Sequence, residues 1–234
     1  MELNKIYNMD CEKGLKLLKD NFCDVGFTSP PYNRIRNDVY EHYNDTLEDY
    51  YGMIVRVTNE MLRVCKNQVI VNIQANHFNK TDVFRYIGHF AEHLKGIVVW
   101  EKLNPQPATN FREQDETYSI TNAYEFFFIL ACEKTKNEDF RANNKIKNII
   151  QTGVNTLSFE GHSAVMKYEV AEWFIHNFTK KGDVVLDCFM GLGTTALACE
   201  NLERKYIGFE ISNEYVKMAN ERIENQTRQL KCDI

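Results

Sequence analysis

The feature that most constrains the fold of this chain is a regular alternation between short apolar runs and segments of helical periodicity. Seven runs are rich in aliphatic, β-branched and aromatic residues, a composition typical of β-strands. These runs cover residues 5–9, 24–28, 68–73, 96–101, 124–131, 183–187 and 206–210. Several, such as VVLD at 184–187 and EFFFILA at 125–131, are apolar almost throughout. That pattern indicates strands whose two faces are both covered by other elements.

Segments of helical periodicity separate these runs. Apolar residues recur there at steps of three, four or seven, which places them on one face of a helix. The pattern is clearest over 47–65, 165–175, 194–202 and 213–225. Strands that alternate with helices predict an α/β fold with a doubly wound, mostly parallel seven-stranded sheet, and we expect one domain over 1–234. Ligands bind such sheets beyond the carboxyl ends of the strands, so functional residues are expected just after each strand.

Composition removes several classes of protein. Of the 234 residues, 44% are hydrophobic and 26% are charged, a balance typical of globular domains. No run approaches the length of about 18 apolar residues that a membrane span needs. The N-terminus lacks an apolar signal segment, so we expect a cytoplasmic protein. The seven cysteines form no Cys-x-x-Cys pair, which argues against a disulfide framework or a zinc site. Because the net charge is −5, a polyanionic partner would need a local basic face.

A glycine loop follows the run that ends at Asp187. Gly191 and Gly193 permit a sharp turn and a close approach of the backbone to a ligand, and a helix is expected to begin at Thr194. Farther along, another strand is expected to end at Glu210, whose carboxylate can accept from two ribose hydroxyls. The order of strand, glycine loop, helix, strand and acid predicts a nucleoside-containing cofactor.

Two cofactor classes fit such a loop. The pyrophosphate-binding loop of dehydrogenases has a third glycine or an alanine at the place of Ala196, so NAD stays open as an alternative. The string from Asp187 through Phe189 to Thr195 resembles instead the cofactor loop of methyltransferases that use S-adenosylmethionine (SAM).

A second unusual loop follows the run at 24–28. In Ser29-Pro30-Pro31-Tyr32, two trans prolines would stiffen the backbone and hold their carbonyls outward, because neither nitrogen can donate to a strand ladder. A planar amine fits beside them. Its ring stacks on Tyr32 while its N–H groups donate to the Ser29 hydroxyl and the Pro30 carbonyl. Alone, the tetrapeptide could equally be a turn with a surface tyrosine, and the cofactor loop in the same chain favours the functional interpretation.

Together, the two loops resemble the motifs of the β group of exocyclic-amino DNA methyltransferases, in which Ser-Pro-Pro-Tyr precedes the SAM loop. The resemblance spans nearly the whole chain. Its further segments are the adenine-contacting region at 6–18 with Asp10, later motifs at 98–102 and 124–128, the helix before the SAM loop at 162–175, and the ribose-binding segment at 210–215. One departure is Ser163, where the family usually has proline.

This resemblance implies direct transfer of the SAM methyl group to an exocyclic amine of a base that is flipped out of double-stranded DNA. Cytosine N4 is favoured because serine before Pro-Pro-Tyr is more common among cytosine enzymes, and adenine N6 is the alternative. The implied catalytic residues are Ser29, Pro30, Pro31 and Tyr32. The implied cofactor-binding residues are Asp10, Asp187, Phe189, Gly191, Gly193, Thr194, Thr195 and Glu210. No metal is implied.

A C5-cytosine mechanism is rejected, because it would need a thiolate nucleophile, typically behind a proline. The sequence contains no Pro-Cys pair. Cys11 and Cys188 are therefore interpreted as packing residues.

Three polar segments are candidates for contact with DNA, near 33–45, 102–119 and 134–160. The last includes a locally basic stretch with Lys145 and Lys147. The predicted DNA-binding residues in the first two segments are Arg34, Arg36, Lys102 and Arg112.

A seven-stranded core leaves little room for a separate recognition domain in a chain of this length. We therefore also expect a homodimer. The family resemblance allows a restriction endonuclease as a companion protein, with an orphan or phage-borne enzyme as the alternatives. Three alternatives stay open: a methyltransferase for protein glutamine or RNA amines, a non-catalytic partner subunit with the SAM fold, and an NAD oxidoreductase. The first usually carries Asn-Pro-Pro-Tyr and the opposite motif order, and the second would be expected to have lost Tyr32 or the loop glycines.

Overall fold

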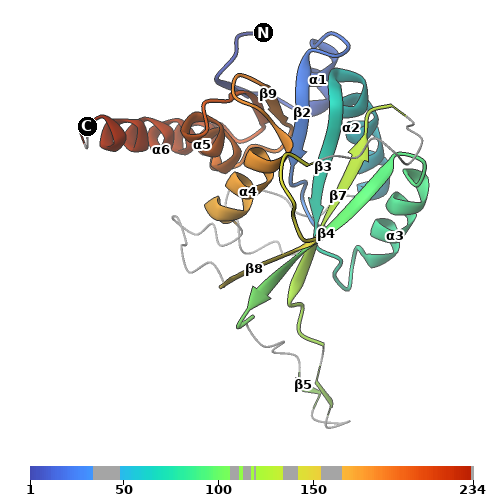
Figure 1. Ribbon diagram of the computed structural model, residues 1–234. Coiled ribbons are helices and arrows are strands. Elements are labelled where there is room, and N and C mark those ends of the chain that lie inside the picture. The colour runs from blue at the N-terminus through green and yellow to red at the C-terminus, as the bar shows by residue number, and fades with distance from the viewer. Residues whose placement is uncertain are drawn as a thin grey trace.

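An eight-stranded sheet forms the centre of the molecule (Figure 1). The computed structural model describes residues 1–33, 48–105, 111–112, 117–118, 120–133, 142–153 and 165–232. In sheet order, the strands are β1 (Lys5–Asn8), β10 (Lys205–Glu210), β9 (Val184–Asp187), β2 (Cys23–Thr28), β3 (Cys65–Ile73), β7 (Tyr124–Ala131), β4 (Leu94–Leu103) and β8 (Ile149–Gly153). Only β7 runs antiparallel to its neighbours in this sheet. The sheet is therefore mostly parallel, as the sequence predicts.

Helices cover both faces of the sheet. The helices α1 (Cys11–Lys16), α2 (Tyr50–Val64) and α3 (Lys80–His89) pack on one face, and α4 (Tyr168–Phe178), α5 (Thr194–Asn201) and α6 (Asn213–Cys232) pack on the other. Successive side chains of a strand point to opposite faces of the sheet and so pack into different cores. Val185 belongs to the core under α4–α6, and Leu186 belongs to the core under α1–α3. This two-sided burial explains why the strands read as continuous apolar runs.

All seven predicted strands are present, but the predicted strand number is corrected from seven to eight. The additional strand, β8, pairs in parallel with β4 at the edge of the sheet. Its sequence, IIQTG, alternates between exposed and half-buried positions, so it lacks the apolar run that marks the interior strands. A separate two-stranded sheet joins β5 (Phe111–Arg112) to β6 (Thr117–Tyr118). The helices α1 and α3 are likewise not among the helices that the sequence predicts.

The candidate DNA-contacting segments are only partly described. Residues 34–47 lie outside the described residues, and so do parts of 102–119 and 134–160. Part of the 102–119 segment forms β5 and β6, and part of the 134–160 segment forms β8. No helix among the described residues is long and apolar enough to cross a membrane.

Candidate active site

The diproline loop and the glycine loop lie side by side at the carboxyl ends of two neighbouring strands. They follow β2 and β9, which are adjacent parallel strands with Val25 opposite Val185. At their carboxyl ends, Thr28 Oγ1 donates a hydrogen bond of 2.7 Å to Asp187 Oδ1, although the two residues are 159 positions apart in the chain. Thr28 immediately precedes Ser29, and Asp187 opens the glycine loop. The fold therefore brings together the two motifs that the sequence analysis paired.

Asp187 anchors both loops from a buried position. Besides Thr28, its carboxylate accepts from Thr195 Oγ1 at 2.6 Å and from the Phe189 backbone N–H at 3.0 Å. Burial raises the pKa of Asp187, while these three donors oppose that rise by stabilising the ionised form. All of these bonds are made within the protein, so Asp187 fixes the shape of the cofactor loop and its distance from the catalytic loop.

The two loop glycines have different structural roles. Both adopt a positive φ, 53° at Gly191 and 76° at Gly193, which side chains rarely tolerate. A Cβ at Gly193 would lie 3.0 Å from the Ala219 Cβ, so glycine here also permits the close approach of α6. Apart from its two chain neighbours, no described residue would have an atom within 4 Å of a Cβ at Gly191. The loop therefore presents its backbone at Gly191 beside open space, as a loop that cradles a ligand must.

Glu210 lies opposite this open space at the end of β10. Its two carboxylate oxygens accept from the Gly191 and Ser212 backbone N–H groups, each at 2.8 Å. Burial raises the pKa of Glu210, and the backbone donors oppose that rise. Each carboxylate oxygen has a second lone pair, so the side chain can still accept from neighbouring hydroxyls. These features fit the ribose of a nucleoside cofactor.

Asp10 lies close to the same end of the sheet. The strand before it, β1, pairs with β10 so that Asn8 lies opposite Glu210. The Asp10 side chain caps α1 by accepting from the Lys13 backbone N–H at 3.0 Å. The described structure therefore gives Asp10 a capping role, and its predicted contact with adenine stays a prediction.

Arg222 of α6 lies in the segment of helical periodicity at 213–225, and its side chain binds the glycine loop. Its Nη1 donates to the Leu192 carbonyl and to Thr194 Oγ1, both at 3.0 Å. Burial lowers the pKa of Arg222. Because the hydroxyl of Thr194 contacts Arg222 and that of Thr195 contacts Asp187, both threonine side chains are directed into the protein. A cation within an otherwise apolar helical stripe was the sequence signal for Arg222.

The catalytic loop is held by polar side chains of β3 and the residues that follow it. The described residues contain no cis peptide, so both prolines are trans, as the sequence interpretation assumed. The Tyr32 carbonyl accepts from Asn76 Nδ2 at 2.9 Å and from Asn79 Nδ2 at 2.8 Å. Asn72 Oδ1 lies 3.1 Å from Ser29 Oγ and 2.6 Å from Tyr32 Oη. The loop therefore has a fixed backbone and a fixed hydroxyl network.

A carboxylate also belongs to this network. Glu125 Oε2 lies 2.8 Å from Tyr32 Oη, and Glu125 Oε1 accepts from Lys102 Nζ. Sequence analysis did not identify Asn72, Glu125, Asn76 or Asn79 as site residues. Their signal was a polar residue within or just after an apolar strand, as in VNIQAN at 71–76 and YEFFF at 124–128.

The predicted DNA-binding residues are only partly visible. Arg34 and Arg36 lie outside the described residues, and of Arg112 only the backbone, in β5, is described. Lys102 is described, and its ammonium binds Glu125 and lies 5.1 Å from the centre of the Trp100 ring. Its predicted contact with DNA stays a prediction.

Two cysteines near the site have the properties of packing residues. Burial raises the pKa of Cys11 to about 12 and that of Cys188 well above its usual range. Both thiols are therefore poor sources of the thiolate that a C5-cytosine mechanism would need.

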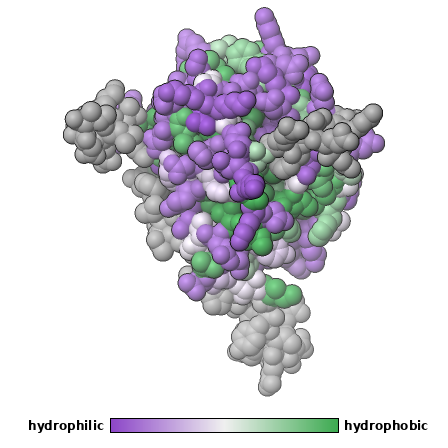
Figure 2. Space-filling model, in the orientation of Figure 1, coloured by the Kyte–Doolittle hydropathy of each residue, from purple (hydrophilic) through white to green (hydrophobic). Residues whose placement is uncertain are grey.

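Large apolar side chains are also exposed at the end of the sheet that carries the catalytic loop. In the view of Figure 2, green apolar areas lie among purple polar residues. Four exposed side chains lie close to strand ends here: Phe78 after β3, Leu103 at the end of β4, Ile120 before β7 and Tyr124 at its start. This edge therefore offers both apolar and polar contacts near Tyr32.

In this doubly wound sheet, a glycine loop that suits a nucleoside cofactor lies beside a diproline loop that suits a planar amine. This combination defines a class of enzymes, those with the methyltransferase fold that act on an amine. Comparison with protein-family models assigns the family. The model of the N6/N4 DNA methylases, described as "DNA methylase", matches residues 23–221. The chain belongs to the N6/N4 DNA methylase family.

Individual relatives agree with this assignment. The chain is 28% identical to the orphan methyltransferase M.BamHII of Bacillus amyloliquefaciens, over 86% of this chain and 89% of that protein. It is 27% identical to the type II methyltransferase M.HinfI of Haemophilus influenzae, over 94% of this chain and 68% of that protein.

Solved structures confirm the fold. PvuII DNA methyltransferase (cytosine-N4-specific) superposes with a TM-score of 0.74 at 18% identity, covering 94% of this chain and 90% of that chain. The complex of M1.HpyAVI with SAM superposes with a TM-score of 0.65 at 25% identity, covering 94% of this chain and 98% of that chain. The predicted α/β methyltransferase fold is therefore confirmed.

Proposed function

We propose that this chain transfers the methyl group of SAM directly to the exocyclic amine of a base flipped out of double-stranded DNA, with cytosine N4 as the favoured target. Family membership makes the chain a SAM-dependent DNA methyltransferase of the N6/N4 type. The observation that carries the mechanism is the hydrogen bond between Thr28 and Asp187, which joins the catalytic loop to the cofactor loop.

The residues that would hold SAM line the glycine loop and the end of β10. Glu210 would accept from the ribose hydroxyls, Asp10 would lie near the adenine, and the backbone at Gly191 would meet the methionine part. When bound there, SAM supplies an electrophilic methyl group on a positively charged sulfur. The protein's part is to hold this group in line with the amine nitrogen.

The catalytic loop would make that nitrogen more nucleophilic. An exocyclic amine is a poor nucleophile because its lone pair is delocalised into the ring. The Ser29 hydroxyl can donate to Asn72 Oδ1, which leaves its own lone pairs available to accept from the amine. Acceptance by Ser29 and by the Pro30 carbonyl disperses positive charge in the transition state, each acceptor contributing about 3 kcal/mol. The nitrogen would take the methyl group from the sulfur, which would leave as a neutral thioether, and the amine would give up one proton to water.

The choice of base rests on Ser29, since serine before Pro-Pro-Tyr favours cytosine N4 in the resembling enzymes. Adenine N6 is the second candidate, because the chemistry of the two amines is alike. Membership of a DNA methylase family argues against protein glutamine or RNA as the substrate.

One experiment tests both the activity and the base. The protein is incubated with unmethylated DNA and SAM with a labelled methyl group, and the DNA is digested to nucleosides for mass spectrometry. We expect label in N4-methylcytosine. Label in N6-methyladenine would transfer the proposal to adenine, and DNA without label would overturn it. Sequencing that detects modified bases would then give the recognition site.

Removing the loop contacts of Arg222 is expected to weaken SAM binding. In Arg222→Met, the Leu192 carbonyl and the Thr194 hydroxyl lose their donor, at a cost of about 1–3 kcal/mol in the free energy of unfolding. We expect the dissociation constant for SAM to rise about tenfold, measured by calorimetry. Lys217→Met is the control, because Lys217 is an exposed cation on the same helix. Equal SAM affinity in both variants would contradict a role for Arg222 in shaping the loop.

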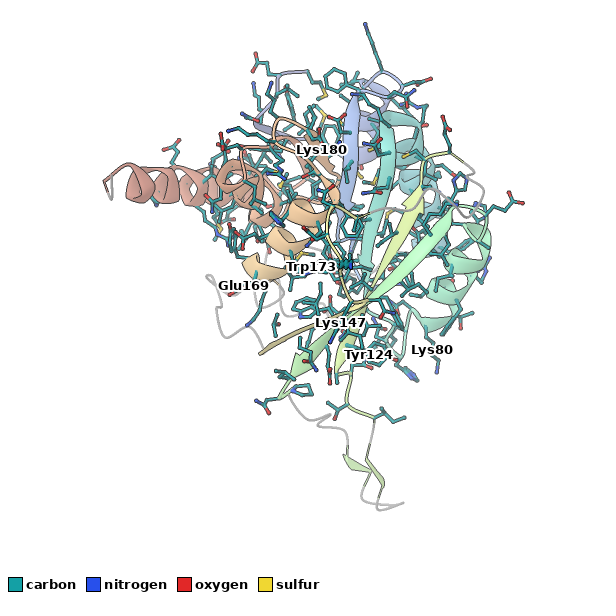
Figure 3. All side chains as sticks on the ribbon, viewed as in Figure 1. Lys80, Tyr124, Lys147, Glu169, Trp173 and Lys180 are labelled. Carbon is teal, nitrogen blue, oxygen red and sulfur yellow. The ribbon has the colours of Figure 1, made fainter. Side chains whose placement is uncertain are left out.

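The basic residues before β8 are expected to contact phosphates. Lys145 and Lys147 are exposed. Figure 3 shows Lys147 at the same end of the molecule as Tyr124, with Lys180 toward the other end. Replacing Lys145 and Lys147 by glutamate should reduce the slope of log Kd against log salt by about 2, since each lost phosphate contact removes about one released counterion. Lys180→Glu should leave the slope unchanged, and an unchanged slope in the double variant would rule out the contact.

The homodimer and the companion restriction endonuclease stay predictions. The homodimer depends on the small size of the chain relative to its task, and the endonuclease depends on the resemblance to the DNA methyltransferases. Sedimentation of a fully active monomer at nanomolar concentration would remove the homodimer.

A further inference from the structure

A largely buried ion pair contacts the hydroxyl of Tyr32. Glu125 on β7 is 4% exposed, and the side chain of Lys102 on β4 is 21% exposed. One oxygen of Glu125 accepts from Lys102 and the other contacts the Tyr32 hydroxyl. The ion pair therefore connects two strands of the central sheet to the residue on which the flipped base is proposed to stack.

Stability alone gives no reason for such a pair. Removing two charges from water is costly, and replacing a buried ion pair by apolar residues of similar volume is often neutral or stabilising. The neighbouring residues of β7, Phe126 to Ala131, show that this strand is otherwise built from apolar side chains. A charged pair at this one position therefore points to a task that an apolar pair could not perform.

The contacts at the two ends of the Tyr32 side chain indicate what the ion pair does. The backbone of Tyr32 is fixed by Asn76 and Asn79, which bind its carbonyl. The hydroxyl at the other end of the ring lies between Asn72 Oδ1 and Glu125 Oε2. A side chain held at both ends keeps one position. Because a phenol O–H lies in the plane of its ring, the direction of a fixed acceptor also restricts the rotation of the ring. A carboxylate is the stronger kind of acceptor for a hydroxyl, and Lys102 holds that carboxylate in place.

We propose that Glu125 and Lys102 are positioning residues, which anchor the Tyr32 hydroxyl and thereby set the plane of the ring that receives the target base. The inference rests on the proposed function, because it assumes that a base stacks on Tyr32. It assigns Lys102 to the interior of the active site. The strands β4 and β7 thus take part in catalysis through Tyr32, without touching the base.

A double-mutant cycle tests this proposal. Glu125→Gln removes the charge while keeping the shape of the side chain, and Tyr32→Phe removes the hydroxyl while keeping the ring. We expect Glu125→Gln to lower kcat/KM for DNA methylation about tenfold in the wild-type background, and to have almost no effect in the Tyr32→Phe background, because the contact is already absent there. Equal effects in both backgrounds, or no effect in either, would overturn the proposal.

A spectroscopic measurement separates positioning from general stability. DNA with 2-aminopurine at the target position reports on the flipped base, whose fluorescence is quenched when it stacks on an aromatic ring. We expect brighter fluorescence with Glu125→Gln than with the wild type. Lys102→Met should give the same increase, and it serves as the second variant if Glu125→Gln does not fold. Unchanged fluorescence in folded forms of both variants would overturn the positioning role.

The controls distinguish this proposal from the proposed function. Glu203→Gln removes an exposed ion pair with Lys181 just before β9 and β10, at the amino end of those strands, and should change neither kcat/KM nor the fluorescence. If the wild-type protein does not methylate DNA, the proposed function fails. If the wild type methylates DNA but the cycle shows no coupling, only the positioning inference fails.

Discussion

Replacing Tyr32 by alanine is expected to lower kcat/KM for DNA methylation by about tenfold to about hundredfold, because stacking of a base on an aromatic ring contributes about 1–3 kcal/mol. The affinity for SAM should stay unchanged, since the Tyr32 hydroxyl contacts Ser29, Asn72 and Glu125, which lie outside the cofactor loop. The measurements are steady-state kinetics with DNA as the varied substrate and calorimetric titration with SAM.

The matched control is Tyr32→Phe, which keeps the ring. It should retain most of the stacking energy and lose only what the hydroxyl anchor contributes. The order of kcat/KM should therefore be wild type, then Tyr32→Phe, then Tyr32→Ala. Unchanged turnover in Tyr32→Ala would overturn the stacking role, whereas a parallel loss of SAM affinity would indicate that the ring supports the cofactor loop instead.

The sequence predicts the interior of the fold well and its periphery less well. Strands such as β9 and β7 are covered on both faces, and they are therefore apolar almost throughout and easy to locate. The edge strand β8 is half exposed and carries Gln151 and Thr152, so no apolar run marks it. Its position depends on pairing with β4, a contact between distant segments that local pattern does not encode.

The site also contains residues that the sequence predicts and residues that it does not. Loop residues such as Gly191 and Tyr32 belong to short motifs, in which consecutive residues indicate the chemistry. Asn72 and Glu125 support Tyr32 from strands 40 and 93 positions away in the chain. Only the sheet order, which places β3 between β2 and β7, brings them together. A polar residue within an apolar strand indicates that its side chain has a hydrogen-bond partner, but only the three-dimensional structure identifies that partner.

Replacing Asp187 by alanine is expected to impair both loops at once. The hydroxyls of Thr28 and Thr195 and the Phe189 N–H would lose their shared acceptor in a buried place. We expect a loss of about 2–5 kcal/mol in the free energy of unfolding, together with weaker SAM binding and lower turnover. This pattern differs from that of Tyr32→Ala, in which SAM binding should be preserved. Unchanged SAM affinity in a folded Asp187→Ala protein would show that the cofactor loop does not depend on this anchor.

The matched variant, Asp187→Asn, isolates the charge of this anchor. Its amide oxygen can still accept from Thr28 and Phe189, and its amide nitrogen can donate to the Thr195 hydroxyl, so the loss of stability should be smaller. Burial raises the pKa of Asp187 above its ordinary value of 3.8. Because the pKa is higher in the folded chain, the contribution of this carboxyl group to the free energy of unfolding is fully present below pH 3.8. That contribution is lost as the pH rises through the pKa of the folded state. The wild-type advantage over Asp187→Asn should therefore decrease with rising pH in that window, as measured by chemical denaturation. A difference that does not change with pH would show that the carboxyl group titrates alike in the folded and unfolded chains, and its hydrogen bonds would then balance the cost of burying it.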